Sequence, residues 1–152
     1  MDLALDQFRR PTRRLRKVLG PLLSDYEYVF LDCPPSISLV SESVFEAADA
    51  LLVPVVPASL SSRTLAQLDG VLDGGPELLP FFSMVDLRRR LHREIVEQLR
   101  AERVDVLEAA IPMSAEVERM GSRRAALASF APRGRAAAAY EALWAEVAAR
   151  LG

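Results

Sequence analysis

Short apolar runs alternate with amphipathic stretches along this chain, and this alternation constrains the fold more than any other feature of the sequence. Apolar runs of strand length, separated by segments of helical periodicity, are typical of α/β folds built on a parallel sheet. The 152 residues, 51% apolar and 26% charged, suffice for one domain with a buried core. We therefore expect a single domain over residues 1–152, with a mostly parallel sheet flanked by helices.

The apolar runs predict strands over residues 26–32, 50–56 and 79–85, and a short fourth strand within 104–111. The amphipathic stretches predict helices over residues 12–23, 59–72, 87–101, 114–121 and 134–151, and one from Ser36 or Ser38 to Ala48. The leucines and the isoleucine of 87–101 predict an inward stripe of Leu87, Leu91, Ile95 and Leu99. The corresponding stripe of 59–72 is Leu60, Leu65, Leu68 and Leu72. That of 134–151 is Tyr140, Leu143, Trp144, Val147 and Leu151.

Composition excludes several classes of protein. The single cysteine, Cys33, cannot form an internal disulfide, so the fold does not depend on an oxidising compartment. No apolar run approaches the roughly 18 residues of a membrane span, and no secretion signal follows Met1, so we expect a cytoplasmic protein. We expect Cys33 to be a small buried residue and His92 a surface residue, rather than a nucleophile–base pair or a zinc site.

Asp32 is the sharpest candidate for chemistry, because it ends a predicted apolar strand and ligands of parallel sheets bind where strands end. Such a carboxylate can hold Mg²⁺ beside nucleotide phosphates, or it can cap the next turn. Pro34 and Pro35 then fix two successive φ angles, which suits a stiff phosphate-sensing loop as well as any tight turn.

The same residues carry a resemblance to a known family. YEYVFLDCPPS (26–36), followed by AADALLVPVVPASLSSRTLAQL (47–68), resembles the middle of the ParA/MinD deviant-Walker ATPases, and most of all the ParA branch. SMVDLRRRLHREIVEQLR (83–100) resembles the family's Thr-Met-x-Asp stretch and the helix after it. Residues 110–112 resemble its Ile-Pro segment, and 129–143 its closing loop and last helix. The resemblance covers nearly all of residues 12–151, in order.

This resemblance implies a P-loop NTPase-like, Rossmann-like fold and the cofactors ATP and Mg²⁺. By the same resemblance, Asp32 serves catalysis by helping to hold Mg²⁺, and Pro34 and Pro35 form the switch that follows it. The residues implied to line the adenine side are Met84, Asp86, Pro112 and Met113.

The resemblance also implies partners: a second copy in an ATP-closed homodimer, non-specific DNA of the nucleoid, and a ParB-like stimulating protein. The arginines in the neighbourhood that the family uses for DNA are Arg100, Arg103, Arg119, Arg123 and Arg124. A second basic run, of Arg9, Arg10, Arg13, Arg14, Arg16 and Lys17, fits either phosphate contacts or the solvated face of a helix. The net charge of −2 predicts no general attraction to nucleic acid.

One departure from the family pattern decides what to expect of the mechanism. The family's Lys-Gly-Gly-x-Gly-Lys-Thr loop, which cradles the phosphates, is absent from these 152 residues. Gly70 and Gly75 have the spacing of a phosphate loop, but Pro76 and Glu77 follow them in place of a lysine and a serine or threonine, so the match is rejected. We therefore expect the chain to correspond to the C-terminal portion of a ParA-like ATPase, and to be inactive alone.

Other interpretations stay open. A chain without the phosphate loop can also be a non-catalytic DNA-binding or dimerisation module, a MinD-like positioning protein, or an α/β domain with another role. An in-frame phosphate loop encoded upstream of Met1 would favour the partition ATPase. The sequence does not name the cargo, which could be a chromosome, a plasmid or another assembly.

Overall fold

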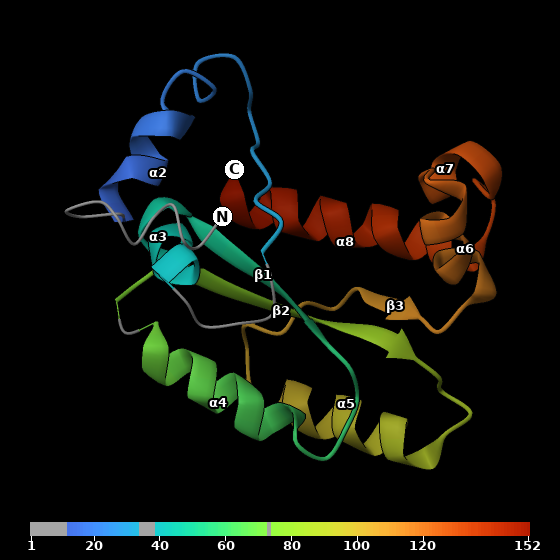
Figure 1. Ribbon diagram of the computed structural model, residues 1–152. Helices are drawn as coiled ribbons and strands as arrows, with labels where there is room; N and C mark the ends of the chain where they lie inside the picture. The colour runs from blue at the N-terminus through green and yellow to red at the C-terminus, as the bar shows by residue number, and fades with distance from the viewer. Residues whose placement is uncertain (1–11, 34–38, 73) are drawn as a thin grey trace. The chain divides into compact units, whose positions relative to one another are not determined.

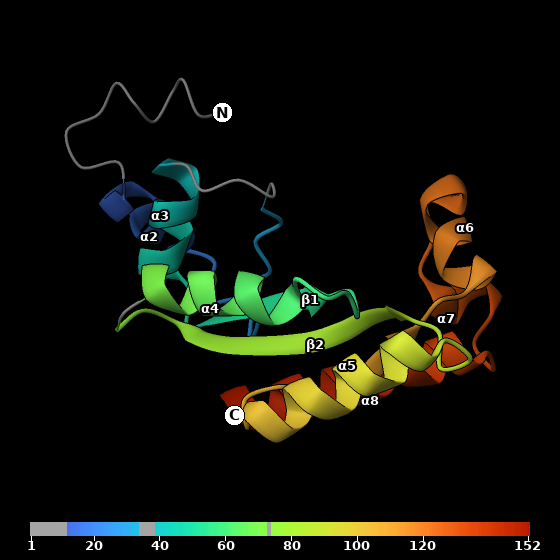
Figure 2. The ribbon, with the colours of Figure 1, turned by 90° about the horizontal axis from the view of Figure 1, so that it is seen from below.

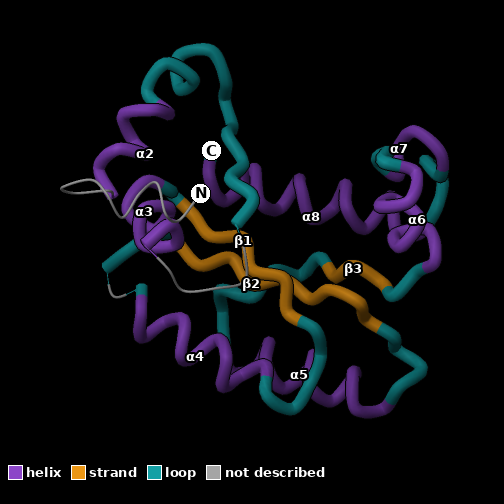
Figure 3. The backbone as a smooth tube through the Cα atoms, viewed as in Figure 1, coloured by secondary structure: helices purple, strands orange, loops and turns teal. Residues whose placement is uncertain are grey.

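Three strands form one sheet in the computed structural model, in the order β1–β2–β3 (Figures 1 and 3). The structure describes residues 12–33, 39–72 and 74–152. The strands are β1 (Ala50–Val55), β2 (Glu77–Val85) and β3 (Ala110–Pro112). β2 and β3 run parallel, with Phe82 opposite Ala110 and Val85 opposite Pro112. The predicted α/β fold with a parallel sheet is therefore confirmed.

The helices are α2 (Thr12–Leu19), α3 (Leu39–Ala47), α4 (Ser61–Val71), α5 (Arg90–Glu102), α6 (Ala115–Arg123), α7 (Leu127–Phe130) and α8 (Arg135–Leu151). The chain divides into two compact units, residues 1–51 with 72–77 and residues 52–71 with 78–152. In the first unit, α2 packs against α3. In the second, α4 and α5 lie on one side of the sheet and α8 lies on the other, against β3 (Figures 1 and 2). None of the described helices is long and apolar enough to cross a membrane.

The core of the second unit is built around β2. Residues 78–82 are buried in succession, as expected of a parallel strand covered on both faces. Phe82 and Leu79 are fully buried in this run. Leu65 of α4, Leu99 of α5 and Ile111 of β3 are each 1% exposed, so these elements supply the apolar partners of the strand.

The strand predicted over residues 26–32 does not form. These residues belong to no strand of the described sheet, and Tyr26 and Phe30 are 61% and 69% exposed. The apolar pattern describes only the side chains that a buried strand needs. A strand also needs a neighbouring backbone that pairs with its N–H and C=O groups, and the pattern does not specify one.

The short strand predicted within residues 104–111 forms as β3, at the end of that stretch. Val104 is 96% exposed, whereas Leu107 is fully buried and donates its N–H to the carbonyl of Pro80 over 2.8 Å. The backbone N–H groups of Glu108 and Ala109 donate to the carboxylate of Glu146 on α8. Because the carboxylate of Glu146 already accepts these two N–H groups, the segment before β3 forms a loop instead of a strand.

Helix faces differ from the prediction in three places. In α5 the buried stripe runs through His92, Val96 and Leu99, while Leu87 and Leu91 are exposed. In the segment 59–72, Leu65 and Leu72 are buried as predicted, but Leu60 precedes α4 and is 67% exposed. In α8, Leu143 and Val147 are buried with Ala136 and Ala137, whereas Tyr140, Trp144 and Leu151 remain 37–40% exposed.

Candidate functional site

The carboxyl ends of β2 and β3 lie side by side. Val85, the last residue of β2, is opposite Pro112, the last residue of β3. Its carbonyl accepts the backbone N–H of Met113 over 2.9 Å, which extends the pairing one residue beyond β3. The four residues predicted for the adenine side, Met84, Asp86, Pro112 and Met113, are therefore neighbours along this edge of the second unit.

Met84 has an uncommon backbone conformation at this edge. Its φ of +56° lies in the left-handed region, and the register between β2 and β3 is irregular between Phe82 and Val85. Non-glycine residues rarely adopt this region, and such outliers cluster at functional sites. The side chains of Met84 and Met113 are 48% and 46% exposed, so two thioethers are accessible at one edge. Methionine adapts its shape to a flat apolar ligand.

Asp86 is paired with Arg88. Its Oδ1 accepts the backbone N–H of Arg88 over 3.1 Å and Nε over 2.9 Å, and its Oδ2 accepts Nη2 over 3.0 Å. These side-chain and backbone hydrogen bonds from Arg88 lower the pKa of Asp86 to about 2. The carboxylate is thus charged, and it is hydrogen-bonded to Arg88 in the turn after β2.

His92 is the residue at this edge that sequence reasoning misplaced. It is 4% exposed, not a surface residue, and its Nδ1 accepts the backbone N–H of Asp86 over 3.1 Å. The signal was present in the sequence, because His92, Val96 and Leu99 also have the helical spacing i, i+4, i+7. Arg93, one residue further along α5, donates Nη1 to the carbonyl of Leu87 over 2.6 Å.

Asp32 belongs to the first unit, where its side chain is exposed. Its predicted roles toward Mg²⁺ and catalysis stay predictions. Cys33 is also exposed, against the expectation of burial; partial desolvation and, second, the charge of Asp32 raise the pKa of its thiol. Pro34 and Pro35 lie outside the described residues. Across the described part of the chain, no group of three or more His, Cys, Asp or Glu side chains could hold a metal ion.

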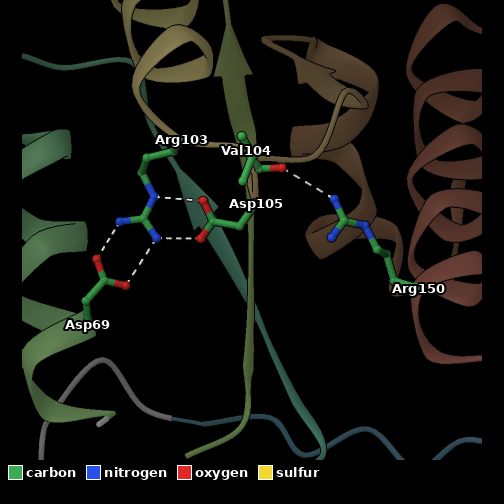
Figure 4. Close-up of polar contacts among 5 residues, drawn as sticks. All are labelled: Asp69, Arg103, Val104, Asp105 and Arg150. Carbon is green, nitrogen blue, oxygen red and sulfur yellow. Dashed lines mark hydrogen bonds and ion pairs between the residues drawn. The ribbon is translucent and has the colours of Figure 1, made fainter. Parts of the chain in front are cut away.

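Arg103 is the centre of an ion-pair cluster (Figure 4). Its guanidinium donates to both carboxylate oxygens of Asp69 on α4 and to both of Asp105 in the loop before β3. The hydrogen bond from Arg103 lowers the pKa of Asp69, and the two carboxylates raise the pKa of Arg103. The side chain is 19% exposed, so this predicted DNA residue joins α4 to the end of α5.

The other arginines predicted for DNA fall into two groups. Arg100 donates Nη2 to the carbonyl of Glu108, and its guanidinium lies 5.8 Å from the centre of the Phe82 ring. Arg119, Arg123 and Arg124 of the α6 segment are exposed. The guanidinium of Arg123 lies 4.8 Å from the centre of the Phe130 ring, which leaves its charge at the surface.

The chain is similar in sequence to several known proteins. The family model described as an AAA domain matches residues 1–73, the segment that contains Asp32. The chain is 32% identical to "Chromosome partitioning protein ParA" of Myxococcus xanthus over 108 residues, which cover 65% of this chain and 38% of that protein. It is 27% identical to "Sporulation initiation inhibitor protein Soj" of Bacillus subtilis over 150 residues, covering 90% of this chain and 57% of that protein. These matches support the predicted resemblance to the ParA-type partition ATPases.

The chain spans between 38% and 57% of the length of these two relatives. Its fold is similar to that of cobyrinic acid a,c-diamide synthase from Mycobacterium smegmatis, solved with bound ADP and magnesium. The TM-score is 0.58 at 20% identity, over 82% of this chain and 59% of that one. The likeness supports the P-loop NTPase-like fold.

Proposed function

We propose that the chain supplies the adenine side of the nucleotide site in a ParA-like protein that partitions chromosomal or plasmid DNA. The observation that carries this proposal is the meeting of Met84, Asp86, Pro112 and Met113 at the carboxyl ends of β2 and β3. Adenine is a flat, weakly polar ring, and two half-exposed thioethers beside a proline offer it a matching apolar surface. The name of the Myxococcus xanthus relative supports partition as the process served.

The phosphate side of the site is only partly provided by this chain. Asp32 is an exposed carboxylate that can hold Mg²⁺ together with nucleotide phosphates and water, because Mg²⁺ commonly takes only one or two protein carboxylates. The 152 residues contain no glycine-rich lysine loop to neutralise the phosphates. The chain by itself therefore binds ATP weakly and does not hydrolyse it.

Single-turnover hydrolysis tests this statement. Purified chain in excess over labelled ATP and Mg²⁺ is expected to release phosphate at the rate of a protein-free sample. A clear burst of phosphate that disappears in Asp32→Asn would contradict it, and would show that these residues alone assemble the catalytic site.

Non-specific DNA is the second ligand of the proposal. Arg119, Arg123 and Arg124 are exposed and close in sequence, whereas Arg100 and Arg103 are committed to internal contacts. We assign the phosphate contacts to the first three residues. The expected binding is independent of sequence and weakens steeply with salt.

Salt-dependent DNA binding tests this assignment. Replacing Arg119, Arg123 and Arg124 by alanine should reduce the slope of log K against log salt by ~0.9 for each DNA phosphate that the variant no longer neutralises. Arg63→Ala, which removes an exposed arginine from α4, is the matched control and should leave the slope unchanged. Equal slopes for the triple variant and the wild type would contradict the assignment.

The proposal extends to the partners of the family: an ATP-closed homodimer on the nucleoid and a ParB-like stimulating protein. The second candidate is a non-catalytic DNA-binding or dimerisation module, for which the exposed Arg119, Arg123 and Arg124 also fit. Binding of adenosine distinguishes the two candidates, because a module without a nucleotide-dependent function does not require an adenine-binding surface.

A further inference from the structure

The turn after β2, residues 86–89, is anchored by a buried histidine. His92, the third residue of α5, is 4% exposed, and its Nδ1 accepts the backbone N–H of Asp86 over 3.1 Å. An accepting Nδ1 carries no proton, so the imidazole proton of neutral His92 is on Nε2. The side chain thus bridges the first turn of the helix and the first residue after the strand.

The backbone N–H of Arg89 donates to the carbonyl of Asp86 over 3.0 Å, and the other side-chain bonds of this turn are made at the surface. Arg88 donates to the carboxylate of Asp86, and Arg93 donates to the carbonyl of Leu87. The side chain of Arg88 is 90% exposed, and such surface ion pairs contribute little. The His92 bond is partly withdrawn from water, where a hydrogen bond is stronger and its loss leaves a backbone donor unsatisfied.

We propose that His92 is a positioning residue for the adenine surface. By holding the amide of Asp86, it fixes the turn two residues after Met84 and thereby stabilises the left-handed backbone that presents the Met84 side chain. A surface ordered before binding has less conformational freedom to lose when the ligand arrives. The inference rests on the proposed function, which supplies the ligand for this edge.

Two substitutions with the same branched skeleton of four side-chain heavy atoms test the anchor itself. In His92→Asn the amide oxygen stands where Nδ1 stood and can accept the Asp86 N–H, whereas His92→Leu has a methyl group there and no acceptor. Hydrogen exchange of the Asp86 amide should be about tenfold faster in the leucine variant than in the asparagine variant. Equal exchange in the two would overturn the inference, because only the asparagine variant keeps an acceptor for the Asp86 N–H.

Adenosine binding, followed by NMR of the Met84 and Met113 methyl groups, links the anchor to the site. The dissociation constant should be about fivefold larger for the leucine variant, with the asparagine variant close to wild type. If wild type binds adenosine and both variants bind equally well, the inference fails and the proposed function stands. If wild type does not respond at all, the proposed function fails.

The wild-type protein provides a further measurement should the variants not fold. Long-range ¹⁵N–¹H spectra of His92 are expected to report a proton on Nε2 and none on Nδ1. A neutral His92 with its proton on Nδ1 could not accept the Asp86 amide, and that result would overturn the inference.

Discussion

At the scale of single residues, the most informative pair is Asp86 with Arg88. The pairing lowers the pKa of Asp86 from 3.8 to about 2. A carboxyl whose pKa is lower in the folded than in the unfolded chain stabilises the fold above its unfolded pKa. The stabilisation from this pair should therefore be complete above about pH 5 and be lost as the pH falls toward 2.

Replacing Arg88 by alanine should raise the pKa of Asp86 toward 3.8, because the first causes of the lowered value are the hydrogen bonds that Arg88 donates. NMR titration of the Asp86 carboxyl carbon measures this directly. Arg90→Ala is the control, because Arg90 pairs with Glu94 over 2.6 Å. This variant should leave the pKa of Asp86 unchanged. An unchanged Asp86 titration in Arg88→Ala would show that another group controls the carboxylate.

Arg103 illustrates how a predicted ligand residue can be structural. Replacing it by alanine leaves Asp69 and Asp105 facing each other without their shared cation. We expect the free energy of unfolding, measured in urea, to fall by about 1–3 kcal/mol. Arg63→Ala, on the helix α4 that carries Asp69, should change the free energy of unfolding by less than about 0.5 kcal/mol. Equal losses in the two variants would mean that the cluster does not join the elements as Figure 4 suggests.

At the scale of elements, the loop before β3 shows that an apolar residue need not be a buried one. Val104 is 96% exposed and Leu107 is fully buried, although both lie in the apolar stretch 104–111. Val104→Ser should therefore change the free energy of unfolding by less than about 0.5 kcal/mol. Leu107→Ala should cost about 2–5 kcal/mol, measured in the same urea experiment. A large loss in Val104→Ser would show that this valine is buried in solution.

The elements also show what the sequence can predict. Sequence reasoning located every described helix of eight or more residues, with a capping serine as the signal before α3, and the runs 50–56 and 79–85 located β1 and β2. The strand prediction for 26–32 was wrong, because an apolar run does not specify a neighbouring backbone with which it can pair. The predicted stripe was also wrong in α5, where two stripes share Leu99 and only packing decides that His92 is on the buried one.

At the scale of the whole molecule, family resemblance and structure contribute different parts of the site. The motif at 83–86 and the Ile-Pro segment located Met84, Asp86, Pro112 and Met113, and parallel pairing brings them together. Nothing in a linear pattern reports the left-handed backbone of Met84 or the hydrogen bond between His92 and Asp86, because both arise from tertiary contacts. Asp32 belongs to another compact unit, so its part in the site rests on resemblance.

The central claim is that the joined carboxyl ends of β2 and β3 form an adenine surface, and one measurement tests it most directly. Adenosine, which has no phosphates, is titrated into the chain labelled with ¹³C at the methionine methyl groups. Saturable shifts at Met84 and Met113 are predicted, while Met120, which packs beside Leu127, stays unmoved as an internal control. No response at Met84 and Met113 at millimolar adenosine would contradict the account.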